Sequence, residues 1–600
     1  MDKGIAWGSH TQHSRTIDHD GLLQIYSKII GMISSNNFSS PPQNETIRFS
    51  WLDVIALCGF ALFAVATFIG RWKGLTPFVF LSSDAGIVSS FVGAYQHPDL
   101  FRGDVLLGDF TNFRYYLALH PLLIFVINKL TGDYGLAYIS LLLLTVFVQC
   151  SGFYLLGVTL FKSRYWAILL VIINLAPVAL PVREFWGIYD DPLPRSLFHA
   201  CLPFLLTAAF RFKNEVRMWP WLMVFTGLMF YTHPVSAPSW AFAIWLGLLV
   251  FLPTQWGVLK KLAYMFALGL VFVVTVLPWA LNFLLVHERP ASAAVNYNDV
   301  VGIIADRVGA ELLDVGIALT LWLKEVSSWP FWFYSLWAVA GSVVLWSQRR
   351  DLRADIKLVA VWCLGIVFVA VGLTFVEQTI CRIYDLKRFQ MDSIRGVKYL
   401  VPIMLLMCVW SLAGISRQFQ TGSLKRTLAM LLGAVITTIW VYQSPPVTFI
   451  QTAKAWGHGS LTPRPSKDEI GTVEAINAIK ENTKPGSRIL PLVIPLEIRY
   501  AALRSVVYAY KDGGIFADTN LGSLIEWDKI KKTLDEIDSN NDPRTKLIMT
   551  LDLAKRLNTD YVITDFHVNQ NVASSLGVKV VWSNGSYTLL SLRPEMDSGH

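Results

Sequence analysis

One uninterrupted apolar run constrains the fold of this chain more than any other feature. Residues 134–161, YGLAYISLLLLTVFVQCSGFYLLGVTLF, contain no charged side chain. A helix needs about 20 mostly apolar residues to cross a hydrocarbon core of about 30 Å, so this run is long enough to span a membrane. Ten similar runs predict ten further spanning helices, near 51–70, 165–182, 197–210, 219–233, 236–252, 262–286, 329–347, 357–376, 397–415 and 427–443.

The composition agrees with a membrane protein and excludes several other classes. Hydrophobic residues make up 54% of the chain and charged residues only 16%, whereas soluble domains average about 25% charged residues. The net charge of +8 does not predict nucleic-acid binding, because no basic cluster with interleaved aromatic residues is present. The six cysteines show no CxxC spacing, so neither a disulfide framework nor a zinc site is indicated.

The loops between the apolar runs predict the orientation. Lysine and arginine concentrate in the loops at 162–164, 211–217, 260–261, 348–357 and 417–426. By the positive-inside rule these loops are cytoplasmic, and the longer, more acidic loops at 71–133, 183–196, 287–328 and 377–396 face outward. Residues 117–130 are apolar, but a further crossing there would invert every later loop, so we expect them to lie along or dip into the outer face.

The charge pattern also divides the chain into four parts. Residues 1–50 form a cytoplasmic tail, in which the weakly amphipathic stretch 21–35 is either an interfacial helix or part of a partly ordered tail. Residues 51–443 form the membrane domain, and residues 444–463 a polar linker. Residues 464–600 form an external α/β domain, with strand patterns at 487–494, 504–510 and 560–566, helix patterns at 526–537 and 546–557, and a hairpin over 578–592 that turns at Asn584 and Gly585.

The first outward-facing loop holds a carboxylate at the membrane margin. Asp84 ends the apolar stretch LTPFVFLSS and precedes the helix-like stretch AGIVSSFVGAY. Partial burial raises the pKa of a carboxyl group and suits a general base, and a nearby cation would lower it again. The other interpretation is a helix N-cap, a position that aspartate commonly occupies.

The second outward-facing loop, REFWGIYDDPLPRS, concentrates acids between two arginines. Glu184, Asp190 and Asp191 lie there, with Arg183 and Arg195 on either side. Asp190 and Asp191 either bind a divalent cation such as Mg²⁺ or Mn²⁺, or form a solvated turn stabilised by pairing with those arginines. Arg195 is suited to bind one of the acids or a phosphate.

The fourth outward-facing loop carries basic residues where the positive-inside rule expects few. A basic patch at headgroup depth suits an anionic lipid phosphate, and snorkelling anchors are the alternative. The basic residues of this loop are Arg382, Lys387, Arg388, Arg395 and Lys398. We expect Arg382, Arg388 and Arg395, with Arg195 from the second loop, to bind the phosphate.

This order of helices, acidic external loops and a C-terminal external domain resembles the GT-C superfamily of polytopic glycosyltransferases, which use polyprenyl-phosphate-linked sugars. The C-terminal stretch RYAALRSVVYAYKDGGIF is similar to external domains of poorly characterised bacterial members. The resemblance implies that Asp84 acts as base or positions the acceptor, and that Asp190 and Asp191 occupy the place of an acidic motif that binds a metal in oligosaccharyltransferases. The chain departs from that pattern, because its acids are adjacent and no WWD-type acceptor motif is present.

The sequence therefore predicts an enzyme of a bacterial inner membrane, with its C-terminal domain in the periplasm. It would move a sugar from a polyprenyl-phosphate donor to a lipid, glycan or protein. A catalytically silent subunit of a larger membrane assembly is the first alternative. A transporter is less favoured, because the predicted spans contain few ionisable residues and no inverted repeat is apparent.

Overall fold

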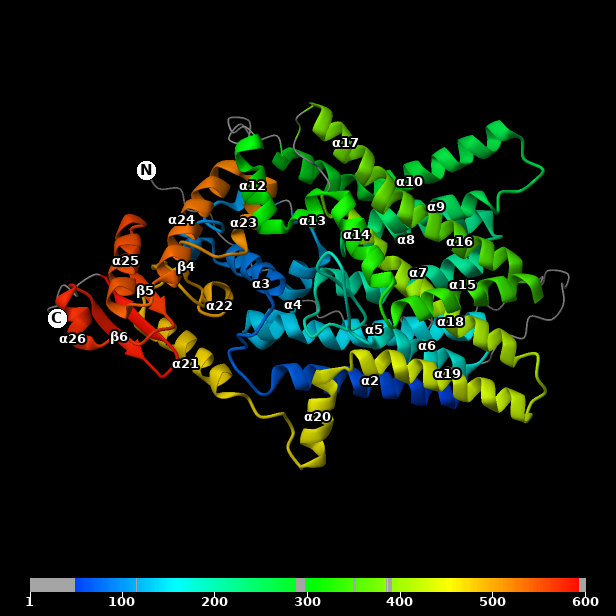
Figure 1. Ribbon diagram of the computed structural model, residues 1–600, viewed down its shortest axis with the longest axis horizontal. Helices are drawn as coiled ribbons and strands as arrows, with labels where there is room; N and C mark the ends of the chain where they lie inside the picture. The colour runs from blue at the N-terminus through cyan, green and yellow to red at the C-terminus, as the bar shows by residue number, and fades with distance from the viewer. Residues whose placement is uncertain are drawn as a thin grey trace, which may run out of the picture. The chain divides into compact units, whose positions relative to one another are not determined.

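The computed structural model describes residues 49–114, 116–287, 297–348, 352–384, 386 and 391–592. Within them, the predicted class of polytopic helical membrane protein with a C-terminal α/β domain is confirmed (Figure 1). The predicted interfacial helix at 21–35 lies outside the described residues.

Each apolar run that the sequence pointed to contains a helix. Among the described residues, six helical segments are long and apolar enough to cross a membrane: 51–72, 134–161, 258–284, 353–384, 392–416 and 424–443. The helices at the predicted positions are α2 (Trp51–Trp72), α5 (Tyr134–Phe161), α6 (Arg164–Leu175), α7 (Pro194–Phe212), α8 (Trp219–Phe230), α9 (Ala237–Leu249), α10 (Val258–His287), α15 (Phe331–Gln348), α16 (Arg353–Val367), α18 (Leu400–Ser416) and α19 (Leu424–Gln443). After α16 the chain continues through a π-helical turn, η5 (Phe368–Leu373), into α17 (Thr374–Tyr384).

Helix α6 is shorter than the predicted segment 165–182, and the difference shapes the second loop. The helix ends at Leu175, and Ala176 is already extended, with φ −58° and ψ 121°. Pro177 is the reason, because a proline disfavours helical backbone at the residue before it. Residues 178–186 instead form a hairpin of β1 (Val178–Leu180) and β2 (Glu184–Trp186), in which Leu180 pairs with Glu184.

Unlike the second loop, the other three loops predicted to face outward contain helices. The first contains α3 (Ser83–Gln96) and α4 (Leu119–Thr131). At 13 residues, α4 is about 20 Å long and too short to cross a core of about 30 Å unaided. The third loop contains α12 (Tyr297–Val308), α13 (Ala310–Leu313) and α14 (Val315–Val326), and the fourth contains the 3-10 helix η6 (Met391–Tyr399).

The C-terminal domain is built on a five-stranded sheet in the order β4-β3-β5-β7-β6. Its strands are β3 (Arg488–Pro491), β4 (Ser505–Val506), β5 (Tyr561–Thr564), β6 (Lys579–Ser583) and β7 (Thr588–Ser591). Strand β3 is parallel to β4 and β5, whereas β7 is antiparallel to β5 and β6. The helices are α21 (Lys467–Asn482), α22 (Pro495–Tyr500), α23 (Asp512–Thr519), α24 (Leu521–Ser539), α25 (Pro543–Arg556) and α26 (Gln570–Ser575). The predicted strands, helices and closing hairpin are thus present.

The predicted polar linker at 444–463 is largely helical. Helix α20 (Val447–Gly457) packs on α2, where the Thr452 hydroxyl donates a 2.8 Å hydrogen bond to the carbonyl of Ala66. A Cβ atom at Gly70 would lie 2.2 Å from the carbonyl oxygen of Thr448, so only glycine permits this close approach. The connection between the two domains is therefore held against the first membrane helix.

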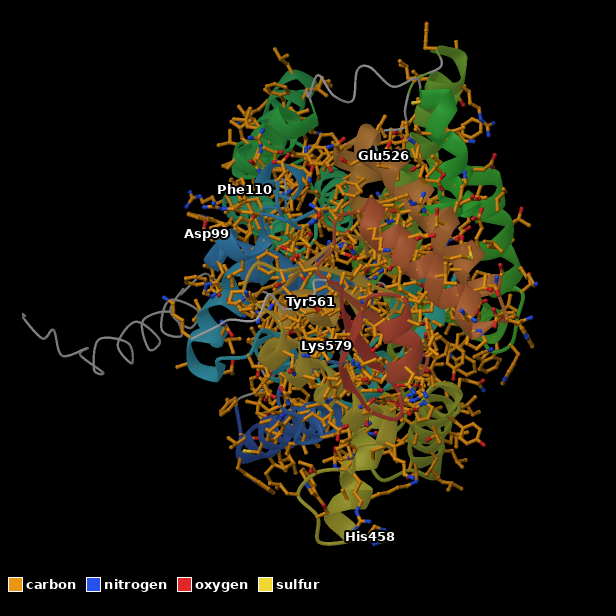
Figure 2. All side chains as sticks on the ribbon, turned by 90° about the vertical axis from the view of Figure 1, so that its left-hand side faces the viewer. Asp99, Phe110, His458, Glu526, Tyr561 and Lys579 are labelled. Carbon is orange, nitrogen blue, oxygen red and sulfur yellow. The ribbon has the colours of Figure 1, made fainter. Side chains whose placement is uncertain are left out.

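The C-terminal domain shares a hydrophobic core with the first outward-facing loop. Phe78 and Phe91 of that loop lie in one buried cluster with Tyr500 and Val506. Figure 2 shows Phe110 of the same loop on the side of the molecule that carries the C-terminal domain. In Figure 1 this domain lies at one end of the long helices, and the α9–α10 and α18–α19 connections lie at the other. The basic loops and the C-terminal domain are thus at opposite ends of the helices.

Candidate functional site

A buried glutamate of the second loop is the centre of a charged cluster. Glu184 on β2 is only 4% exposed. Its carboxylate lies 2.6 Å from Nζ of Lys398, 2.9 Å from Nη1 of Arg195 and 3.5 Å from Nε of Arg395. Burial alone would raise the pKa of Glu184, but Lys398, Arg195 and Arg395 outweigh it and lower this pKa below its usual value. The glutamate is therefore ionised and gathers cations from α7 and η6.

Asp84 belongs to the same cluster. Helix α3 begins at Ser83 with Ser82 as its N-cap, so Asp84 is not the cap, and that alternative is wrong. Its carboxylate instead accepts a 2.8 Å hydrogen bond from Nη2 of Arg195 and forms an ion pair with Lys511 of the C-terminal domain. Burial opposes ionisation, but Lys511 and Arg195 outweigh it and hold the pKa of Asp84 below its usual range. The first turn of a helix also favours a negative charge.

Arg195 joins the two outward-facing loops. One guanidinium nitrogen binds Glu184 and the other binds Asp84, and the group lies 5.1 Å from the centre of the Phe185 ring. The side chain is 13% exposed. A planar guanidinium suits such a double contact, which a lysine could not reproduce with the same geometry. The structure thus brings together Asp84, Glu184 and Arg195, three of the residues that the sequence singled out.

The two adjacent acids of the second loop, Asp190 and Asp191, contact residues outside this cluster. Asp191 is buried, with Oδ1 2.9 Å from the guanidinium of Arg71 and Oδ2 accepting the backbone N–H of Ser82. Asp190 accepts a 3.2 Å hydrogen bond from the hydroxyl of Thr448 on α20. These contacts hold the second loop against the C-terminal end of α2, the start of α3 and α20.

The expected pairing of these acids with Arg183 or Arg195 is wrong. Arg195 is occupied by Asp84 and Glu184, and Arg183 lies 3.3 Å from Glu311 of α13. The hairpin that replaces the end of α6 separates Arg183 from the acids. Proximity in sequence did not predict the partners of these residues, because the two acids and Arg183 contact α2, α13 and α20 instead of one another.

Asp190 and Asp191 do not fit a divalent cation. Such a cation needs several oxygen ligands, but both carboxylate oxygens of Asp191 are engaged by Arg71 and Ser82. Over the described part of the chain, no group of three or more histidine, cysteine, aspartate or glutamate residues could hold a metal ion.

The arginines predicted to bind phosphate do not all lie in one cluster. Arg395 and Arg195 lie in the cluster around Glu184, and Arg395 also pairs with Asp392 at 3.2 Å. Arg382 is 67% exposed and pairs at 2.6 Å with Asp314 before α14, so it does not join them. Arg388 lies outside the described residues. Of the four arginines predicted to bind phosphate, Arg195 and Arg395 therefore lie in the cluster that contains Asp84 and Glu184.

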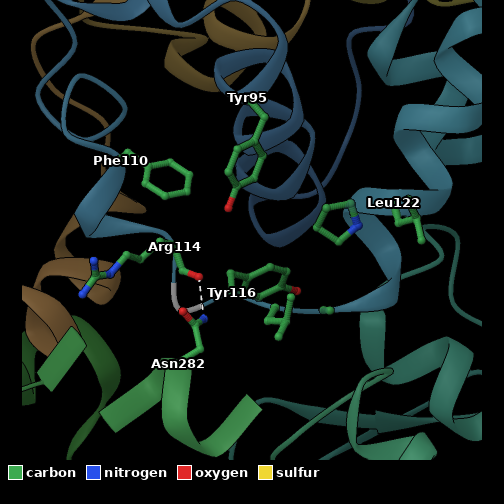
Figure 3. Close-up of a pocket in the computed structure, with 9 residues that line it drawn as sticks. Tyr95, Phe110, Arg114, Tyr116, Leu122 and Asn282 are labelled. Carbon is green, nitrogen blue, oxygen red and sulfur yellow. Dashed lines mark hydrogen bonds between the residues drawn. The ribbon is translucent and has the colours of Figure 1, made fainter. Parts of the chain in front are cut away.

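Residues of the first loop and of α10 line a cavity of about 490 Å³ (Figure 3). Apolar and aromatic side chains form most of its wall, and Asn282 on α10 closes one side by donating a 2.8 Å hydrogen bond to the carbonyl of Arg114. Tyr116 lines the cavity; burial, and then the negative charge of Asp84, raise the pKa of its phenol. A volume of this size is typical of ligand sites. The lining residues are Tyr95, Phe110, Arg114, Tyr116, Leu117, Ala118, Pro121, Leu122 and Asn282.

Sequence reasoning missed two residues of the site. Arg71 ends α2 on the side where the positive-inside rule expects few basic residues, and that departure was a usable signal. Lys511 follows a strand-like segment of the C-terminal domain, and no local pattern points to Asp84.

The fold and the charged cluster define a polytopic membrane protein whose first, second and fourth predicted outward-facing loops meet the C-terminal domain at one polar site. Comparison with protein-family profiles and with curated proteins finds no match. Among solved structures, the chain is similar to the crystal structure of ArnT from Cupriavidus metallidurans bound to undecaprenyl phosphate. The TM-score is 0.41 and the identity 13%, over 91% of this chain and 99% of that chain.

Proposed function

We propose that this protein is a membrane glycosyltransferase of the GT-C type. It transfers a sugar from a polyprenyl-phosphate donor to a hydroxyl group of a lipid, glycan or protein at the outer face. The observation that carries the proposal is the ionised carboxylate of Asp84, which Arg195 and Lys511 bind and whose charge acts on Tyr116 in the wall of a cavity of about 490 Å³. A base, nearby cations and a concave pocket are the features by which a candidate active site is recognised.

The chemistry is a single displacement at the anomeric carbon. The acceptor oxygen forms a bond to this carbon while its proton passes to Asp84, and the bond between the carbon and the phosphate oxygen breaks. The electron pair of that bond leaves with the polyprenyl phosphate. Arg195 and Arg395 stabilise the charge that develops on the phosphate through charge-assisted hydrogen bonds. Attack opposite the leaving group inverts the configuration of the sugar.

The remaining acids have structural roles in this proposal. Glu184 fixes Arg195, Arg395 and Lys398, whereas Asp190 and Asp191 fasten the second loop and hold no metal ion.

The test measures release of polyprenyl phosphate from a panel of undecaprenyl-phosphate monosaccharides by mass spectrometry. The wild-type protein should consume at least one donor when membrane lipids are supplied as acceptors. Asp84→Asn should reduce that rate at least about a hundred-fold, because a general base typically contributes this much or more. The matched control is Asp99→Asn, an acid of the same loop that is 76% exposed and pairs only with Arg102 among the described residues. Equal rates for Asp84→Asn and wild type would contradict the proposal.

A catalytically silent subunit of a membrane assembly is the second candidate. It is favoured by one observation: cations occupy both carboxylate oxygens of Asp84. In that case no donor in the panel is consumed, and the protein copurifies with a partner from its own membrane.

A further inference from the structure

Lys511 is the residue that the C-terminal domain contributes to the candidate site. It immediately precedes α23, and its ammonium group forms an ion pair with Oδ1 of Asp84, 427 positions earlier in the chain. The Lys511 side chain is 24% exposed and the Asp84 side chain 35% exposed, so this pair is partly open to solvent at the margin of an otherwise buried cluster. A partly exposed ion pair can exchange one anionic partner for another.

The backbone around Lys511 is fixed on both sides. Arg307 of α12 donates a 2.9 Å hydrogen bond to the carbonyl of Tyr510, and its guanidinium lies 4.4 Å from the centre of the Tyr510 ring. The next residue, Asp512, is fully buried and bound at 2.6 Å by Arg499. Only the flexible stem of Lys511 is therefore free to move, and its ammonium group can turn without any change in the fold.

The cluster around Asp84 and Glu184 contains more positive than negative side chains. Its carboxylates are Asp84, Glu184 and Asp392, and its cations are Arg195, Arg395, Lys398 and Lys511. A largely buried cluster with an excess positive charge is stabilised by an anion. A phosphate also offers more acceptor oxygens than the single carboxylate oxygen that Lys511 now contacts.

We propose that Lys511 is a phosphate-binding residue that leaves Asp84 for the phosphate of the polyprenyl donor. The inference rests on the proposed function and adds a role for the C-terminal domain. When the donor binds, its phosphate forms an ion pair with the ammonium group of Lys511. One carboxylate oxygen of Asp84 is then free to accept a hydrogen bond from the acceptor hydroxyl. Donor binding thus activates the base, so Asp84 does not act before the donor phosphate is bound. No bond is made or broken in this exchange.

The test is direct binding of undecaprenyl phosphate to the full-length protein in detergent, measured by native mass spectrometry and by thermal stabilisation. Undecaprenol, which lacks the phosphate, and inorganic phosphate, which lacks the chain, separate the two parts of the ligand. Lys511→Gln should weaken binding of undecaprenyl phosphate about ten-fold or more, as expected for one charged hydrogen bond, and leave undecaprenol unaffected. Lys511→Arg should retain most of the affinity. The matched control is Lys529→Gln, a lysine of the same domain that is 65% exposed and pairs with Glu526.

A second set of variants separates phosphate binding from a purely structural ion pair. Asp84→Asn removes the competing carboxylate and should strengthen undecaprenyl phosphate binding a few-fold. If Lys511 binds the phosphate, adding Lys511→Gln to Asp84→Asn should again weaken binding about ten-fold. If Lys511 serves only Asp84, the second substitution should change nothing, and that result would overturn the inference.

The binding readout also distinguishes the inference from the proposed function. A wild-type protein that binds undecaprenyl phosphate, with Lys511→Gln binding equally well, overturns the role of Lys511 and leaves the transferase standing. A wild-type protein that binds neither undecaprenyl phosphate nor inorganic phosphate contradicts both.

Discussion

Arg499 of the C-terminal domain and Asp104 of the first outward-facing loop form an ion pair in which neither side chain is exposed to solvent. Two nitrogens of Arg499 lie 2.8 Å from the two carboxylate oxygens of Asp104, and a third lies 2.6 Å from Asp512. Asp104 also accepts a 2.9 Å hydrogen bond from the backbone N–H of Val506 on β4. The first loop and the C-terminal domain are therefore joined by buried charges as well as by a common hydrophobic core.

Arg499→Ala should destabilise the protein strongly. Two carboxylates, Asp104 and Asp512, would stay buried without their cation, which typically costs about 3–5 kcal/mol. The measurement is thermal unfolding in detergent. Lys529→Ala, which removes an exposed pair with Glu526, is the control and should cost less than about 1 kcal/mol. Similar unfolding temperatures for the two variants would show that the buried pair does not hold the domain.

Chelation should leave the activity of the protein unchanged, because both oxygens of Asp191 are engaged by Arg71 and Ser82. Asp191→Asn should instead lower the free energy of unfolding by about 1.5–3 kcal/mol, the usual range for a charged hydrogen bond. Asp190→Asn should cost less, since Asp190 accepts a single 3.2 Å hydrogen bond from Thr448. Loss of activity with EDTA, restored by Mg²⁺ or Mn²⁺, would show that the acids do bind a metal.

Glu497→Gln should change the pH dependence of stability. Glu497 lines a cavity of about 420 Å³ with Asp190 and Asp191, and burial raises its pKa from 4.5 to about 7. Between these values the folded protein binds more protons than the unfolded chain, so the stability of the wild type falls as the pH rises. Glutamine cannot ionise, and the variant should be more stable than the wild type by about 1–3 kcal/mol at pH 8.

The measurement for Glu497→Gln is the unfolding temperature of both proteins from pH 4 to pH 8. The two curves should approach each other toward pH 4, where Glu497 is mostly neutral in both states. A difference that stays constant over the whole window would contradict the raised pKa.

The predicted orientation can be tested at Ser539, an exposed residue at the end of α24. Residues 464–594 contain no cysteine, so Ser539→Cys introduces one label site into this domain. A membrane-impermeant thiol reagent should label it in intact spheroplasts, with the parent protein as the background control. Labelling that requires lysis would place the C-terminal domain in the cytoplasm.

The sequence by itself determined the membrane helices. The run at 134–161 forms α5 over the same residues, because an uncharged segment of this length can satisfy its backbone in lipid only as a helix. The strands of the C-terminal domain, its closing hairpin and helices α24 and α25 were also predictable, since their side-chain periodicity is local. The end of α6 was missed because its apolar residues continue past Pro177, where they form a strand.

Tertiary structure alone decided the partners of the charged residues. The acids Asp84 and Asp191 were visible in the sequence, but their cations Lys511 and Arg71 are 427 and 120 positions away. The predicted pairs relied on neighbours in the chain. In the structure, Arg195 binds Asp84 and Glu184, and Arg183 lies beside Glu311. Helix formation depends on nearby residues, whereas an ion pair depends on which surfaces a folded chain brings together. The sequence could therefore predict which loops carry the charged residues, and only the packing of the C-terminal domain on the first loop could show that Lys511 joins Asp84.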